Sequence, residues 1–174
     1  MTQSTGSQQP SFVASGIGGL PSLQFSASAH QTITTGTNFY APVSIFYVAR
    51  QLGTNSARIL SGYYNNWLMG WHGNAMDQAY FSGWVSAIDT PLTTTDPYLY
   101  EAVLTGTNSA LYRNGALLYS NGGGTQGPDG LTIGFLGQSE FSDCQISEIM
   151  VFNSAVTTER RQYVERYFMT KYGL

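Results

Sequence analysis

Apolar residues recur along the chain in short runs that are separated by turn-forming residues. The runs 58–64, 67–71, 79–85 and 98–104 are rich in aromatic and aliphatic side chains, and Asn, Gly and Pro lie between them. Short, regularly punctuated runs of this kind are typical of an antiparallel sandwich. The run 43–50 is almost continuously apolar, which predicts a central strand covered on both faces. The pattern therefore predicts an all-β, two-sheet fold.

A tight hairpin is predicted in the last third of the chain. Asn114 and Gly115 lie between two alternating apolar runs that extend over 109–119. This dipeptide favours a type I′ turn, in which both central residues have positive φ. Further strands are predicted over 131–137 and 144–153.

The two ends of the chain differ in pattern. Residues 1–19 are polar and Gly-rich, and the first predicted strand covers 20–25. Residues 157–172 repeat with the helical period and predict a short terminal helix. Thr157 is its expected N-cap, and Gly173 is expected to end it.

This helix is predicted to be amphipathic. One apolar face is formed by Tyr163, Val164, Tyr167 and Phe168. Arg161 and Glu165 are spaced for an ion pair across one turn. Four of the seven basic residues of the chain lie in the helix, and we interpret them as a solvated outer face.

Three phrases of the sequence resemble the laminin-G-like jelly rolls of the concanavalin A-like lectin and glucanase superfamily. They are the hairpin phrase 111–115, the phrase 152–157 after the last strand, and the closing phrase 171–174. The resemblance implies a jelly-roll sandwich. Relatives usually carry an additional strand upstream of the one predicted over 20–25. An exposed sheet edge is therefore expected, paired by another protein chain or by the polar N-terminal segment.

Length and composition limit the possible partners. The 174 residues fit a single domain, 1–174, of which 10% are charged, and the net charge is −3. A basic run outside the helix is missing, so nucleic acid is not an expected partner. Neither an export signal nor an apolar run of membrane-spanning length is present, and membrane insertion is not expected. We expect either a module of a secreted protein or a protein assembled onto a virion.

Catalysis and metal binding are not predicted. Glycosidases of the superfamily carry the signature Glu-x-Asp-x-x-Glu. This chain has Glu140, Asp143 and Glu148 instead. Because side chains alternate between the two faces of a strand, this spacing does not place the three carboxylates in register on one face. Many relatives bind calcium after the strand matching 23–25, but residues 26–31 contain no acid, so a calcium cofactor is not supported. Cys144 is the only cysteine and is interpreted as a small core residue.

The segment 65–84 is the best candidate for a ligand site. It contains all three tryptophans together with amide and carboxylate side chains, the groups that stack on sugar rings and bond their hydroxyls. Trp67 and Trp71 would lie on the same face of a strand. Large aromatic residues in a sandwich usually fill the core rather than bind a ligand. The candidate ligand-binding residues are Trp71, His72, Asn74, Asp77, Tyr80 and Trp84.

Taken together, these patterns favour a non-catalytic module that binds glycans or mediates attachment at an extracellular or virion surface. The alternative is a structural or decoration protein of a virion or surface assembly without a ligand site. An exposed aromatic pair beside Asn and Asp would favour binding. A flat apolar edge matched to a partner chain would favour the structural role.

Overall fold

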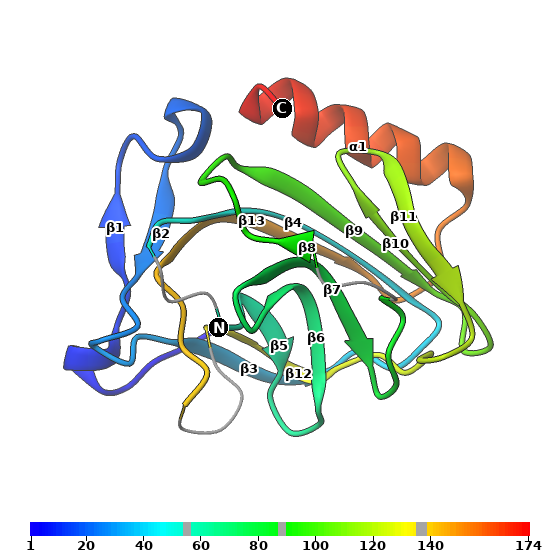
Figure 1. The fold of residues 1–174 in the computed structure, drawn as a ribbon, viewed down its shortest axis with the longest axis horizontal. Coiled ribbons are helices and arrows are strands. Elements are labelled where there is room, and N and C mark those ends of the chain that lie inside the picture. Colours follow the sequence, from blue (N-terminus) through cyan, green and yellow to red (C-terminus); the bar gives the residue numbers. More distant parts are fainter. Residues whose placement is uncertain (54–56, 87–89, 135–138) are drawn as a thin grey trace.

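The computed structural model describes residues 1–53, 57–86, 90–134 and 139–174 of the chain. Two antiparallel sheets pack face to face, and one helix covers the outer face of the larger sheet (Figure 1). The predicted all-β jelly-roll sandwich with a C-terminal helix is confirmed.

The larger sheet contains seven strands and the smaller sheet six. In spatial order the larger sheet consists of β1 (Ser11–Val13), β2 (Ser22–Phe25), β13 (Cys144–Phe152), β4 (Val43–Gln51), β9 (Tyr98–Leu104), β10 (Ser109–Arg113) and β11 (Ala116–Asn121). The smaller consists of β3 (Ile33–Asn38), β12 (Asp129–Ile133), β5 (Leu60–Gly62), β6 (Trp67–His72), β7 (Ala75–Phe81) and β8 (Thr90–Pro91). Two short 3-10 turns, η1 (Gly6–Gln8) and η2 (Ile17–Gly19), and the helix α1 (Thr158–Tyr172) complete the described elements.

β4 is the central strand that its sequence predicts. It pairs with β13 on one side and with β9 on the other. Ile45 and Tyr47 point into the core between the sheets, whereas Phe46 and Val48 pack beneath α1. Burial on both faces explains why this run is continuously apolar rather than alternating.

The predicted hairpin is also confirmed. β10 and β11 pair on either side of Asn114 and Gly115, whose φ angles are 47° and 78°.

The other strand predictions hold with small shifts, except that β7 begins at Ala75 and ends at Phe81, earlier than the run 79–85. The predicted strand 131–137 is described as far as residue 134, and its remainder lies outside the described residues. Cys144 is a free, fully buried thiol, as expected for a core residue.

The N-terminal segment is more ordered than its polar sequence predicts. Residues 1–19 contain β1, which pairs with β2 and forms one edge of the larger sheet. Thr2 forms an isolated bridge with Thr34 of β3, an edge strand of the smaller sheet. The segment therefore covers parts of two sheet edges, as one of the two sequence alternatives predicts.

Both ends of the helix match the sequence prediction. The hydroxyl of Thr157 accepts a hydrogen bond from the Arg160 backbone N–H at 3.3 Å. Gly173 adopts the left-handed conformation at the C-terminus, and its N–H bonds to the Met169 carbonyl. The ion pair of Arg161 with Glu165 is present at 2.9 Å.

The predicted apolar face of the helix is only half right. Val164 and Phe168 are buried, but Tyr163 and Tyr167 are 69% and 41% exposed. The buried face is completed by Arg161 and Tyr172 instead. The sequence prediction missed this rotation because it placed every basic residue of the helix in solvent.

Arg161 is buried because the larger sheet supplies its counter-ion. Its guanidinium lies 2.8 Å from the carboxylate of Glu101 on β9, a residue with no exposed surface. The guanidinium also stacks over the ring of Tyr112, 4.0 Å from its centroid. Burial raises the pKa of the Glu101 carboxyl, and the bond and charge of Arg161 oppose that shift. This ion pair fixes the rotation of α1 on the sheet.

We expect Arg161→Ala to lower the free energy of unfolding by about 3–5 kcal/mol, because it leaves the buried charge of Glu101 without its partner. The neighbouring Arg160→Ala is the matched control, because Arg160 is exposed and should contribute about 1 kcal/mol at most. Urea unfolding followed by circular dichroism measures both. Equal, small losses in the two variants would contradict this role for the ion pair.

Candidate functional site

The six predicted site residues lie on β6, on β7, in the turn between these strands and on the segment that follows β7. The two strands pair with Leu68 opposite Tyr80 and Trp71 opposite Met76. Side chains alternate between the two faces of a strand, so some of the six point into the core and others outward. The structure therefore separates the six residues into groups.

Trp71 belongs to the core. Its side chain is 1% exposed and packs edge-on against the ring of Tyr100, with the centroids 4.7 Å apart. Its indole nitrogen is buried with no hydrogen-bond partner among the described residues. The ring cannot stack on a sugar, so the sequence prediction for Trp71 is corrected in favour of the core alternative.

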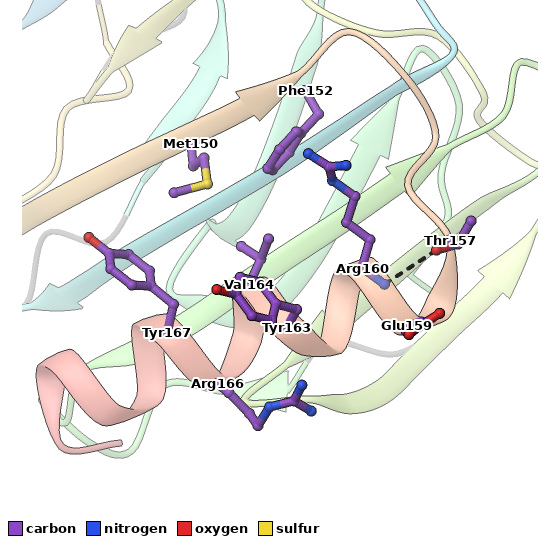
Figure 2. Close-up of a pocket in the computed structure, with 9 residues that line it drawn as sticks. All are labelled: Met150, Phe152, Thr157, Glu159, Arg160, Tyr163, Val164, Arg166 and Tyr167. Atoms are coloured by element: carbon purple, nitrogen blue, oxygen red, sulfur yellow. Dashed lines mark hydrogen bonds between the residues drawn. The ribbon is translucent and has the colours of Figure 1, made fainter.

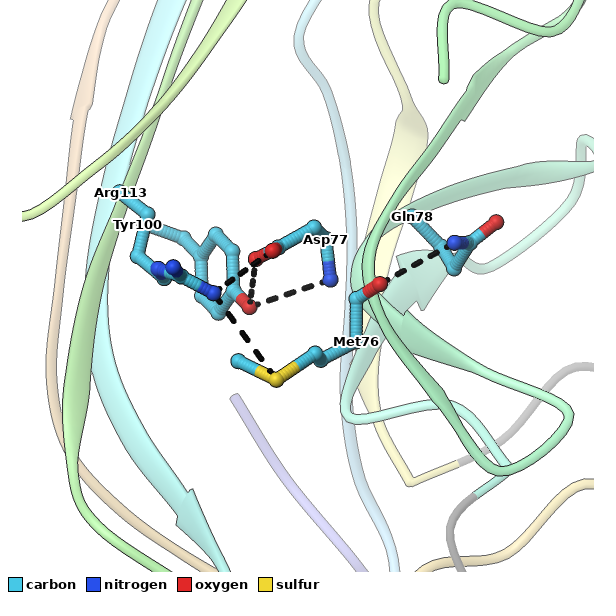
Figure 3. A network of polar contacts seen from close by, with 5 residues as sticks. All are labelled: Met76, Asp77, Gln78, Tyr100 and Arg113. Atoms are coloured by element: carbon cyan, nitrogen blue, oxygen red, sulfur yellow. Dashed lines mark hydrogen bonds and ion pairs between the residues drawn. The ribbon is translucent and has the colours of Figure 1, made fainter. Parts of the chain in front are cut away.

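Asp77 also points into the sandwich, where it joins the two sheets (Figure 3). The Tyr100 hydroxyl of β9 donates a hydrogen bond to one carboxylate oxygen at 2.7 Å. Arg113 of β10 contacts the other oxygen at 2.6 Å. With both oxygens held and only 4% of the residue exposed, Asp77 is a structural residue rather than a sugar ligand.

Asp77 reaches this position through a β-bulge. The pairing of β6 with β7 shifts register between Gly70 and Trp71, which leaves Asp77 as the extra residue with a φ of 64°. Burial, and after it the charge of Asp77, raises the pKa of the Tyr100 hydroxyl well above its usual value. Tyr100 therefore stays a protonated donor to Asp77 across the physiological pH range.

Asn74 is exposed at the turn between β6 and β7. It lines a shallow depression of about 570 Å³ together with Leu92 and the threonines of the segment 93–95. Its backbone carbonyl accepts a hydrogen bond from the Leu92 N–H. The lining of this depression includes none of the other five predicted residues.

Three of the predicted residues come together on the outer face of the smaller sheet. Trp84 is 47% exposed and packs edge-on against Tyr80, with the ring centroids 5.2 Å apart. The ring of His72 lies 5.8 Å from that of Trp84. An isolated bridge between Tyr80 and Trp84 returns the chain to β7 and so places the indole beside the sheet.

Glu140 joins this group, although no sequence pattern pointed to it. Its carboxylate lies 3.2 Å from His72 Nε2 and 3.0 Å from Arg58 Nε. Asn66 in turn holds the Arg58 guanidinium at 2.9 Å. Burial lowers the pKa of Arg58, and the charge of Glu140 partly opposes that shift. His72, Tyr80, Trp84 and Glu140 together are called the outer-face cluster below.

The described residues contain no group of three or more His, Cys, Asp or Glu side chains that could hold a metal ion. Nor do they include a helix with the length and apolar character needed to cross a membrane.

No protein-family model matches the sequence, and no curated protein matches it either. Solved structures match the fold. The binding domain of Paraclostridial Mosquitocidal Protein 1 matches with a TM-score of 0.68 at 11% identity, covering 92% of this chain and 46% of that one. The binding domain of botulinum neurotoxin DC in complex with SialylT gives 0.58 at 14% identity, with 84% and 42% covered. Trypanosoma rangeli sialidase in complex with the inhibitor DANA gives 0.61 at 11% identity, with 84% and 27% covered.

The fold is a laminin-G-like, concanavalin A-like jelly roll. This confirms the fold that the hairpin and closing phrases of the sequence imply. The chain spans less than half the length of the three structures described above. At identities of 11–14% the likeness establishes the fold alone, because one fold hosts many unrelated sites.

Two tryptophan variants separate the core from the surface. We expect Trp71→Ala to lower the free energy of unfolding by about 3–5 kcal/mol, because it empties a large packed volume. Trp84→Ala should cost about 1 kcal/mol or less, because almost half of that residue is already in solvent. Denaturant midpoints measure the difference. A loss for Trp84→Ala as large as that for Trp71→Ala would contradict the assignment of Trp84 to the surface.

Proposed function

We propose that this jelly roll is a non-catalytic glycan-binding module, displayed on an extracellular or virion surface, whose ligand contacts the outer-face cluster. The observation that carries the proposal is the exposed indole of Trp84 beside the fixed carboxylate of Glu140. Aromatic rings stack against the apolar face of a pyranose, and a carboxylate accepts hydrogen bonds from its hydroxyls.

The cluster is held in place before any ligand arrives. The edge-on contact with Tyr80 fixes the plane of the Trp84 ring. Arg58 and His72 hold the two oxygens of Glu140, each of which retains a second lone pair for a sugar hydroxyl. Preorganised groups lose little freedom on binding, which favours recognition by a small, shallow surface.

The distribution of acids supports a binding role without catalysis. A retaining glycosidase needs two carboxylates about 5–5.5 Å apart. Five acids of the described chain are each engaged by a cation: Asp77 by Arg113, Glu140 by Arg58, Glu148 by Lys171, and both Glu101 and Glu165 by Arg161. They lie on different elements, and two of them, Asp77 and Glu101, are buried.

A structural neighbour supports a carbohydrate as the ligand class. The neurotoxin DC binding domain, which shares this fold, was solved in complex with SialylT. For the present chain we propose only the class, a surface carbohydrate. Because one stacking ring contributes on the order of 1 kcal/mol beyond its buried area, a single site should bind weakly and depend on multiple copies.

A glycan array probed with the protein tests the proposal. We expect binding to a subset of surface-type oligosaccharides, with Trp84→Ala reducing the signal at least about tenfold because the stacking platform is lost. Phe12→Ala is the matched control, since Phe12 is a 69% exposed ring on β1 of the other sheet. Calcium should not alter the result.

Two outcomes would reject the site. If the folded wild-type protein binds no glycan on the array, the alternative structural role is favoured. If Phe12→Ala and Trp84→Ala reduce binding equally, the ligand does not contact the outer-face cluster.

A further inference from the structure

One side of β13, which lies between β2 and β4 in the larger sheet, is only partly paired. β2 pairs with residues Cys144–Ile146 at the beginning of β13. β4 pairs with β13 along its other side as far as Phe152. Within the described residues, no strand pairs with the remaining edge of β13, from Ser147 to Phe152. An open edge presents a row of backbone donors and acceptors that can template pairing with another strand.

The open edge is apolar on both faces of the sheet. Ile149 and Val151 face the core between the sheets, and Met150 and Phe152 face α1. All four are only half-buried. Charged or bulged residues usually protect such edges. Here the pairing of β13 with β4 shifts register between Ile146 and Glu148, and Glu148 is held by Lys171 at 2.8 Å, so both features lie at one end of the edge.

A groove runs beside this edge, between β13 and α1 (Figure 2). It has a volume of about 780 Å³. Met150 and Phe152 line it from the strand, and Tyr163, Val164 and Tyr167 line it from the helix. The two tyrosines are the residues that the predicted apolar face of the helix placed in the core, and they remain exposed.

We propose that the occupant of this edge is a second copy of the chain, paired antiparallel through β13 about a two-fold axis at Met150. This pairing places Met150 opposite Met150 of the second copy and Ile149 opposite its Val151, so apolar residues meet on both faces. The two grooves then join into one, which is covered by two antiparallel helices.

The same register places Glu148 of one copy opposite Phe152 of the other. Within each copy, the guanidinium of Arg160 lies over the ring of Phe152, 5.5 Å from its centroid (Figure 2). Residues directly opposite on antiparallel strands have Cβ atoms about 4.5–5.5 Å apart, so the incoming carboxylate lies beside the guanidinium. The described ion pairs contain none for Arg160, and the second copy supplies one at each end of the contact. This charge match favours a copy of the chain over an unrelated apolar partner.

The two-fold axis is perpendicular to the sheet, because opposite residues of an antiparallel pair point to the same face. Both helices therefore lie on one side of the dimer, and both smaller sheets lie on the other. Two outer-face clusters would then face the same surface. The pairing itself does not depend on whether those clusters bind glycans.

Sedimentation velocity over a concentration series tests the pairing. The chain has a mass of 18.9 kDa, and we expect the wild-type protein to sediment with twice that mass. Met150→Lys places two like charges against each other at the axis and should return the protein to the mass of one chain. Met150→Leu is the matched control and should keep the dimer.

A charge reversal tests the register. Arg160→Glu should weaken the dimer, and the double variant Arg160→Glu with Glu148→Lys should restore it, because the new charges attract across the axis. Gln162→Glu adds a carboxylate on the same helix and should leave the dimer intact, since Gln162 is exposed and does not line the groove. Circular dichroism confirms that each variant is folded.

A wild-type protein that sediments as one chain at every concentration would overturn the proposal. So would a dimer that persists in both Met150→Lys and Arg160→Glu, because it must then use another surface. Neither result bears on glycan binding by a single copy, so failure of the pairing and failure of the proposed function are distinguishable.

Discussion

The carboxylate of Asp77 is the constraint on which the rest of this jelly roll depends. It is buried in the sandwich, and its two oxygens are held by Tyr100 and Arg113 of the opposite sheet. A buried carboxylate without partners would be strongly destabilising, so the position of β7 relative to β9 and β10 is fixed by this contact. The bulge at Asp77 also resets the alternation of β7. Met76 and Ala79 both face inward as a result, although an odd number of steps separates them.

This reset links the core to the surface. Past the bulge, Tyr80 points outward, opposite Leu68, and supports the exposed ring of Trp84. On the same face, Glu140 crosses from the segment before β13 to reach Arg58 and His72. A rigid, aromatic core and a fixed polar cluster therefore occupy opposite faces of the same two strands. Loops and faces positioned in this way by a rigid sandwich are where jelly rolls commonly place binding residues.

The parts of the fold that could be predicted are those with local causes. The turn at Asn114 and Gly115, the cap at Thr157 and the doubly covered strand β4 each follow from a few neighbouring residues. The buried face of α1 could not be predicted in the same way. Its rotation depends on Glu101, which lies 60 residues before Arg161 along the chain. The periodicity of apolar residues within the helix sequence carries no information about a counter-ion so far away along the chain.

The candidate site was predicted in part for the same reason. Three of its residues follow from the concentration of rings and polar groups on β6 and β7. Trp71 and Asp77 were misplaced, because strand parity alone does not reveal the bulge that turns Asp77 into the sandwich. Glu140 was missed because its contact with His72 spans the sequence from β6 to the segment before β13, with no local signal at either end.

The most direct test of the account is the response of the tryptophan indole N–H signals to a glycan. The chain has three tryptophans, of which Trp67 and Trp71 are buried and Trp84 is exposed, so proton–nitrogen correlation spectra report core and surface separately. On titration with the oligosaccharide that binds best on the array, the Trp84 signal should shift with saturation. The signals of Trp67 and Trp71 should stay nearly unchanged. A ligand that binds while the Trp84 signal does not move would contradict the assignment of glycan binding to the outer-face cluster.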